Sequence, residues 1–84
     1  MKLQIYVTLK PGVLDPQGRA IAHALGALGF AGIGEVRAGK FIEIEVADQT
    51  DDATIDRMCR DLLANTVIED YRVERQERTG EGRA

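Results

Sequence analysis

The chain has 84 residues, with 14 acidic side chains against 11 lysines and arginines and a formal net charge of -3. A single domain of this size buries only about 60–65% of the surface that its unfolded form exposes, so its stability margin is thin. The negative balance, with both signs interspersed, argues against a nucleic-acid backbone as the main partner. No apolar run approaches the ~18 residues of a membrane span, and the N-terminus lacks the charged-then-apolar pattern of a signal peptide.

Cys59 is the only cysteine of the chain. An intramolecular disulfide is therefore excluded and a reducing compartment fits best, so we expect a complete, cytoplasmic chain. Oligomerisation commonly supports a core this small when neither disulfides nor a metal site reinforce it. We therefore also expect dimers or a larger assembly.

The first third of the chain predicts a strand followed by a helix. Apolar and polar residues alternate over residues 3–9, as in a strand with one face on a core. Asp15 followed by Pro16 favours a helix start, because the carboxylate can accept from free backbone N–H groups and proline loses nothing in the first turn. Apolar residues continue at helical spacing to Leu28, and Gly29 supplies the left-handed residue that commonly ends a helix.

The middle of the chain predicts a β-hairpin. A weak strand pattern around residues 35–37, interrupted by Gly34, is typical of an edge strand. Gly39 follows at the point where a tight hairpin turn needs a positive φ, and residues 40–46 alternate as a third strand.

The last third predicts a second helix and a fourth strand. Asp51 and Asp52 offer a cap and favourable negative charge at the helix start, and an apolar stripe runs through residues 55–63. Residues 68–75 form the last strand, whereas residues 76–84 are polar and lack apolar anchors. We expect one domain over residues 1–75 and a disordered C-terminal tail, 76–84, that plays no part in folding.

The element order βαββαβ predicts an α+β, ferredoxin-like fold, a two-layer sandwich. In this arrangement a four-stranded antiparallel sheet carries both helices on one face. The first and third strands, which alternate most strongly, are expected at the centre of the sheet, and the second and fourth at its edges. The face opposite the helices is then open unless a partner covers it.

Two aromatic side chains are expected to be neighbours on this open face. Tyr6 comes from the first strand and Phe41 from the third, where single-stranded RNA-binding domains of this architecture place their base-stacking aromatics. Glu43 and Glu45 share the face with Phe41 and would repel phosphates. We therefore favour burial of Tyr6 and Phe41 against another copy of the sheet over nucleic-acid binding.

The remaining polar residues offer little chemistry. His23 lies opposite the apolar stripe of its helix, without an orienting partner or a pocket, and Cys59 falls inside a stripe as a buried, inert thiol. The acidic pairs at residues 51–52 and 69–70 suit a helix cap and a strand end better than a metal. No glycine-rich phosphate loop, metal-ligand spacing or serine nucleophile elbow is present in the sequence, so we expect no catalytic, cofactor or metal site.

Three segments carry a family resemblance. They are residues 7–18 (VTLKPGVLDPQG), residues 37–43 (RAGKFIE) and residues 62–71 (LLANTVIEDY). Together they closely resemble PurS, the small subunit of bacterial formylglycinamidine ribonucleotide (FGAM) synthase, and the resemblance runs from about Leu3 to Val73. The positions that match the family pattern are Lys10, Pro11, Gly12, Asp15, Pro16, Gly18, Arg37, Gly39, Lys40, Asn65, Glu69, Asp70 and Tyr71.

The resemblance implies a non-catalytic subunit of an ATP-dependent ligase complex in purine biosynthesis. Family members of this kind form dimers or dimers of dimers and bridge a PurL-type synthetase, which uses ATP and Mg, and a PurQ-type glutaminase, so that ammonia can pass between them. We expect these partners, and neither nucleic acid nor a membrane. The residues that we expect at the partner interfaces are Lys10, Asp15, Arg37, Gly39, Lys40, Asn65, Glu69 and Tyr71, with Tyr6 and Phe41 in self-association.

Thr66 departs from the family pattern, which commonly has proline after the asparagine. The change loosens the turn by only about 0.4–1 kcal/mol, because proline acts mainly by restricting the unfolded chain. Two alternatives stay open beside the PurS-like reading: a single-stranded RNA-binding module, and a small-ligand regulatory domain similar to ACT domains. The first predicts a steep salt dependence of RNA affinity, and the second predicts stabilisation by a ligand.

Overall fold

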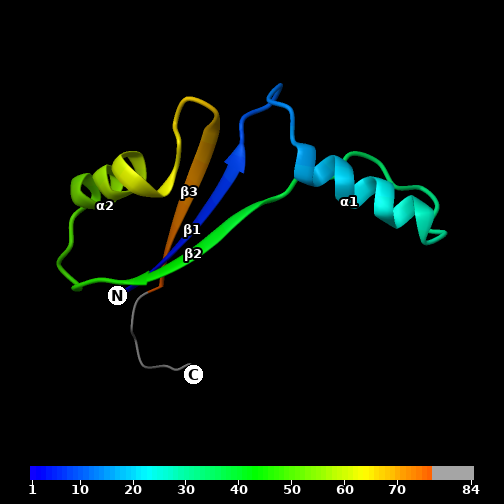
Figure 1. The fold of residues 1–84 in the computed structure, drawn as a ribbon. Helices are drawn as coiled ribbons and strands as arrows, with labels where there is room; N and C mark the ends of the chain where they lie inside the picture. Colours follow the sequence, from blue (N-terminus) through cyan, green and yellow to red (C-terminus); the bar gives the residue numbers. More distant parts are fainter. Residues whose placement is uncertain (77–84) are drawn as a thin grey trace.

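In a computed structural model, which describes residues 1–76, the chain forms a three-stranded antiparallel sheet (Figure 1). The strands are β1 (Lys2–Leu9), β2 (Gly39–Glu45) and β3 (Glu69–Gln76), in the order β2-β1-β3. The register places Tyr6 of β1 opposite Phe41 of β2 and Arg72 of β3. The central position of β1 agrees with its strong alternation, which buries every second side chain.

One face of the sheet carries the core. Leu3, Ile5 and Val7 of β1 are fully buried or nearly so. Helix α2 (Asp52–Met58) and the π-helical turn η1 (Cys59–Leu63) cover this face, and they contribute Ile55 and Cys59 to the core. Asp51 caps α2 as expected, because its side chain accepts a hydrogen bond from the Thr54 N–H.

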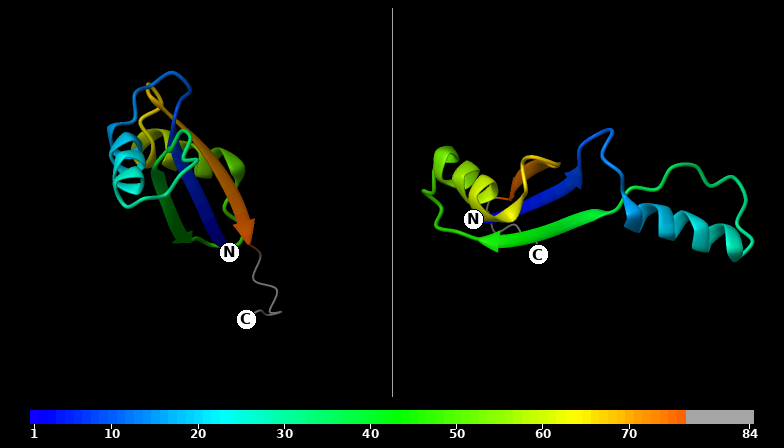
Figure 2. Two further views of the ribbon diagram at one scale, coloured as in Figure 1. Left: turned by 90° about the vertical axis from the view of Figure 1, so that its right-hand side faces the viewer. Right: turned by 45° about the horizontal axis from the view of Figure 1, so that its top comes forward.

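Helix α1 (Pro16–Ala27) does not lie on the sheet. It extends away from the end of the strands, on the opposite side from α2 (Figures 1 and 2). The radius of gyration is 16.6 Å, whereas a compact chain of this length has about 12 Å. The helix begins and ends as the sequence predicts, with Asp15 as its cap and Gly29 at a φ of 97° after its last turn.

The expectation of a four-stranded sheet with two helices on one face is wrong. Residues 35–37 pair with no strand, so the sheet has three strands and β2 lies at its edge instead of its centre. Among the elements of residues 1–76, only α2 and η1 cover the sheet. Both differences accompany the same contacts: the Ala38 N–H donates to the Asp15 carboxylate at the start of α1, and the Arg37 side chain donates to the Leu9 carbonyl oxygen at the end of β1.

Two local expectations also need correction. Gly39 does not adopt a positive φ; it starts β2 at a place where a Cβ atom would collide with the Val7 carbonyl oxygen. Leu62, expected in the buried stripe of the second helix, is 83% exposed, because the π-helical turn changes the phase of the side chains after Met58. Within residues 1–76, no helix is long and apolar enough to cross a membrane.

Candidate functional site

Asp15 joins two of the three family-like segments. This buried carboxylate accepts hydrogen bonds from the Gly18 N–H at 2.9 Å and from the Ala38 N–H at 2.8 Å. These two hydrogen bonds, with the nearby Arg37 charge, hold the pKa of Asp15 below its ordinary value. The residue therefore ties the start of α1 to the backbone that leads into β2.

Gly18 allows this junction to close. A Cβ atom at this position would collide with the Val36 carbonyl oxygen and would crowd the Asp15 carboxylate. Only glycine lets the first turn of α1 approach the returning chain so closely. This contact gives a physical reason for the glycine in the first segment, and it could not be derived from local spacing.

Arg37 reinforces the same junction from the other side. Its guanidinium donates hydrogen bonds to the carbonyl oxygens of Val13 at 3.2 Å, Leu9 at 3.2 Å and Lys10 at 3.1 Å. Arginine suits this task because its planar fork offers several donors in fixed directions. The side chain is therefore engaged within its own chain, and its contribution to a partner interface stays a prediction.

The third family-like segment reaches the same end of the sheet. The Lys10 N–H donates to the Ile68 carbonyl oxygen at 2.8 Å, and the Lys10 ammonium lies 3.6 Å from the Asp70 carboxylate. The Lys40 ammonium donates to the Leu63 carbonyl oxygen at 3.3 Å. All three segments thus meet where β1 ends and where β2 and β3 begin.

A turn at Asn65 shapes the surface of this region. The Asn65 side chain accepts from the Val67 N–H at 3.1 Å, and the Glu69 carboxylate accepts from the Asn65 N–H at 2.7 Å. These bonds satisfy backbone donors between η1 and β3. We call the cluster formed by the three segments the junction; its members are Lys10, Asp15, Gly18, Arg37, Gly39, Lys40, Asn65 and Glu69.

Tyr71, the remaining interface candidate, faces α2. Its hydroxyl donates to the Asp56 carboxylate, which also pairs with Arg60 at 2.9 Å. This hydrogen bond and burial raise the pKa of Tyr71. Nearby Cys59 is fully buried, as expected, and burial together with the Asp56 charge raises the pKa of its thiol. Both groups stay neutral near neutral pH and connect β3 to the helix layer.

The open face of the sheet brings Tyr6 and Phe41 together, as the sequence predicts. Their ring centroids lie 5.1 Å apart, and Phe41 is 54% exposed. Sequence reasoning missed Arg72, whose guanidinium carbon lies 4.3 Å from the Tyr6 ring centroid. The pairing of β1 with β3 places Arg72 opposite Tyr6. The alternation of the last strand, once aligned with β1, would have predicted that Arg72 shares a face with Tyr6.

The described residues include no group of three or more histidines, cysteines and acids that could hold a metal. His23 is exposed, as expected. At the junction, most of the polar side chains that converge bind backbone groups of the same chain. The fold and the junction define a class of small α+β domain. In this class the residues of the three family-like segments fix how the strands and α1 are connected.

Comparison with known proteins gives the family. Residues 2–77 match the family described as PurS, phosphoribosylformylglycinamidine (FGAM) synthase. The PurS subunit of Bacillus subtilis is 50% identical over 78 residues, covering 90% of this chain and 93% of the relative, and the PurS subunit of Mycobacterium leprae is 50% identical over 72 residues, covering 86% and 91%. The chain belongs to the PurS family of FGAM synthase subunits, which act in purine biosynthesis.

Solved structures agree with this assignment. The crystal structure of B. subtilis PurS matches with a TM-score of 0.81 at 50% identity, over 90% of this chain and 98% of that one. The crystal structure of Methanocaldococcus jannaschii PurS matches with a TM-score of 0.73 at 41% identity, over the same shares. The resemblance seen in the sequence is therefore confirmed.

Proposed function

We propose that the chain bridges a PurL-type synthetase and a PurQ-type glutaminase, and that it contributes geometry instead of catalytic groups. The observation that carries this proposal is the junction, where all three family-like segments meet at one end of the sheet. Side chains that bind backbone groups keep a surface rigid, and a rigid surface holds partners at a fixed separation. The junction residues named above as interface candidates form that surface, except Asp15, which is buried and fixes the backbone beneath it.

A bridging subunit without an active site can still control the rate of the glutamine reaction. Ammonia released by a glutaminase must reach the synthetase before it escapes to solvent, so the two sites have to be aligned and sealed. In this proposal ATP and Mg bind the synthetase, and the subunit carries neither. The complex then converts formylglycinamide ribonucleotide, ATP, glutamine and water into formylglycinamidine ribonucleotide, ADP, phosphate and glutamate in the cytoplasm.

Self-association is part of the proposal. A dimer or tetramer presents the junction more than once, related by symmetry, so that one assembly can hold several partner subunits in register. The extended shape of the chain and its exposed apolar side chains support such an assembly.

The RNA-binding alternative finds less support in the geometry. The Arg72 guanidinium already lies over the Tyr6 ring, and Arg72 also pairs with Glu74 on the same strand. A stacked base would therefore have to displace Arg72, and Glu43 beside Phe41 would repel its phosphate.

Charge reversal at Lys40 tests the bridging surface. Lys40 lies in the junction, whereas Lys2 is an exposed lysine at the other end of the same sheet, which makes Lys2→Glu the matched control. We expect Lys40→Glu to lower glutamine-dependent synthesis in a complex reconstituted with PurL and PurQ, by about tenfold. The ammonia-dependent reaction and the circular dichroism spectrum of the subunit should change little. Equal activity of Lys40→Glu and Lys2→Glu would remove Lys40 from the interface.

A further inference from the structure

The arm, which we define as residues 16–36, is attached to the sheet without an apolar core of its own. It consists of α1 and the segment that returns from it toward β2, and it makes little contact with the sheet (Figure 2). Among residues 16–36 only Gly18 is buried. Apolar packing therefore does not fix the direction of the arm relative to the sheet.

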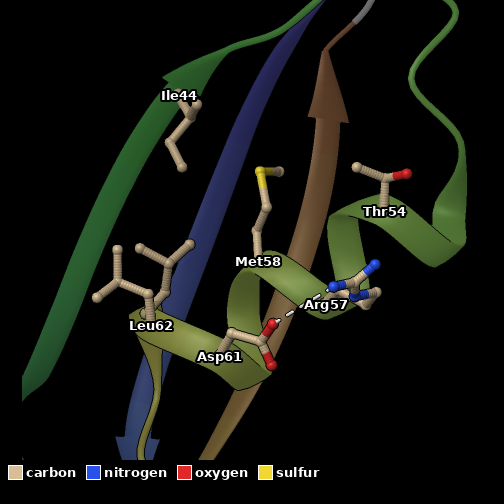
Figure 3. A pocket seen from close by; sticks show the side chains of 7 residues that line it. Ile44, Thr54, Arg57, Met58, Asp61 and Leu62 are labelled. Atoms are coloured by element: carbon tan, nitrogen blue, oxygen red, sulfur yellow. Dashed lines mark ion pairs between the residues drawn. The ribbon is translucent and has the colours of Figure 1, made fainter.

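Helix α2 is held in a different way. Ile55 is 3% exposed, and Met58 packs against the same part of the core. Figure 3 shows Met58 of α2 and Ile44 of β2 extending into the space between the helix and the sheet. A helix that buries its apolar stripe is held in place by many weak contacts. Such contacts are scarce for α1, where Ile21 is 40% exposed and Leu28 is 74% exposed.

Asp15 joins the two ends of the arm instead. Its Oδ1 atom accepts from the Gly18 N–H at the start of α1, and its Oδ2 atom accepts from the Ala38 N–H, where the chain has returned to the sheet. Within residues 1–76, Asp15 is the one buried residue with a polar or charged side chain, at 5% exposure. A buried carboxylate with one oxygen on each segment fixes their relative position through two charge-assisted hydrogen bonds.

Arg37 adds a second link between the same two ends. It follows the arm in the sequence, and its guanidinium donates to the carbonyl oxygens of Leu9, Lys10 and Val13, which precede the arm. Acceptors at both ends of this loop fix how the loop runs into α1. We call the Asp15 carboxylate and the Arg37 guanidinium, with the backbone groups that they bind, the clasp.

A small change at the clasp is magnified at the far end of the arm. Helix α1 has 12 residues and is therefore about 18 Å long. A turn of about 10° at the clasp moves the far end, at Leu28 and Phe30, by about 3 Å. Leu28 is 74% exposed and Phe30 57%, and apolar side chains gathered in this way mark a surface that an assembly covers. Whatever covers them in the FGAM synthase complex follows the direction of the arm.

We propose that Asp15 is a positioning residue for the glutamine-dependent reaction: by fixing the direction of the arm, it sets how completely ammonia from glutamine reaches FGAM. The inference rests on the bridging function proposed above and names a residue that acts in it. Asp15 is buried, so its effect runs through Gly18 and Ala38. A misplacement of about 1 Å far from the reacting groups can cost a factor of about 100 in rate, so a swing of the arm is large enough to let ammonia escape.

Asp15→Asn opens the clasp but keeps the helix cap. The amide oxygen of asparagine still accepts from the Gly18 N–H, and asparagine caps helices about as well as aspartate. The amide nitrogen is a donor and does not accept from the Ala38 N–H. In the isolated subunit, hydrogen exchange should therefore speed up at the Ala38 N–H and change little at the Gly18 N–H.

The functional measurement is the ratio of FGAM to glutamate formed by PurL and PurQ with a saturating amount of the subunit. Each glutamine hydrolysed gives one glutamate and one ammonia, and ammonia that escapes to solvent gives no FGAM. We expect Asp15→Asn to lower this ratio by at least about threefold. The ammonia-dependent rate should change little. A merely structural role would reduce the amount of folded subunit, which saturation offsets, and would leave the ratio unchanged.

Two further variants separate position from charge and from capping. Asp51→Asn makes the same chemical change at the cap of α2, where the carboxylate accepts from the Thr54 N–H of its own helix, and it should leave the ratio unchanged. Arg37→Lys keeps the positive charge but loses the planar fork, so it should lower the ratio. Arg37→Lys also tests the inference if Asp15→Asn fails to fold.

Three results would overturn the inference. The first is a normal ratio in Asp15→Asn or in Arg37→Lys, the second is unchanged exchange at the Ala38 N–H in Asp15→Asn, and the third is an equal loss in Asp51→Asn. Omission of the chain tests the bridging function separately. If omission lowers glutamine-dependent synthesis while Asp15→Asn keeps a normal ratio, the bridging function stands without Asp15; if omission has no effect, the bridging function itself is wrong.

Discussion

The sheet with its α2 layer and the arm, which consists of residues 16–36, follow the same sequence rules. They differ in whether their apolar side chains are buried. Leu3 and Ile5 on β1 are fully buried, whereas Ile21 and Leu28 on the arm stay 40% and 74% exposed. For β1 and α1 the apolar pattern correctly predicts the type of element. Periodicity therefore identifies which face of an element is apolar, but not whether the single chain buries that face.

A core substitution should break the sheet and show the largest effect. Ile5→Ala removes a fully buried side chain from the central strand, and such a change costs about 2–5 kcal/mol. In a domain this small each kcal/mol lowers the unfolding midpoint by about 4–8 °C. Thermal unfolding of dilute protein checks this.

The matched change on the arm is Leu28→Ala. Because Leu28 is mostly exposed in the single chain, we expect a change within about 0.5 kcal/mol for the monomer. A loss as large as that of Ile5→Ala at high dilution would mean that the arm is covered within its own chain, and the contrast between the two regions would fail.

Two glycine-to-alanine changes on α1 should have opposite effects on stability. Alanine at Gly18 collides with the Val36 carbonyl oxygen, whereas alanine at Gly26 meets nothing within 4 Å. We expect Gly18→Ala to cost about 1–3 kcal/mol by overpacking, and Gly26→Ala to gain up to about 1 kcal/mol from helix propensity. Urea unfolding distinguishes them, and hydrogen exchange at the Ala38 N–H should speed up only in Gly18→Ala.

The contrast between Gly18 and Gly26 also shows which features can be predicted from the sequence. The caps at Asp15 and Asp51 and the pairing of Tyr6 with Phe41 are correct, because they depend on local chemistry or on strand alternation. The exclusion of residues 35–37 from the sheet, the contact at Gly18 and the hydrogen bonds of Arg37 could not be predicted. Each depends on residues about 20 or more positions away along the chain. The weak strand pattern at residues 35–37 gave no sign that the next residue, Ala38, donates its N–H to Asp15.

The pH dependence of stability should report the junction at Asp15. The pKa of this carboxylate lies below its ordinary value of 3.8 in the folded chain. Its stabilising contribution is therefore fully present above about pH 4 and is lost as the pH falls through the lower folded pKa. Asp15→Asn lacks this titration, so the gap between the midpoints of the two proteins should narrow on acidification below pH 3.8. A gap that stays constant down to pH 2 would mean that the charge of Asp15 contributes nothing.

A small gain in stability is expected from a change in the turn that connects η1 to β3. Thr66 follows Asn65, whose carbonyl oxygen accepts from the N–H groups of Ile68 and Glu69. Thr66→Pro should stabilise the chain by about 0.4–1 kcal/mol, because it restricts the unfolded state at a turn position that needs no donor. Denaturant unfolding gives the value, and a decrease in stability would show that the Thr66 backbone does not adopt the angle of proline.

The bridging role is tested most directly by the rate of FGAM formation by PurL and PurQ. The rate is measured with and without this chain, using glutamine or ammonia as the nitrogen source. A bridging subunit predicts that omission abolishes most of the glutamine-dependent rate and leaves the ammonia-dependent rate nearly unchanged. Equal glutamine-dependent rates with and without the chain would contradict the bridging role.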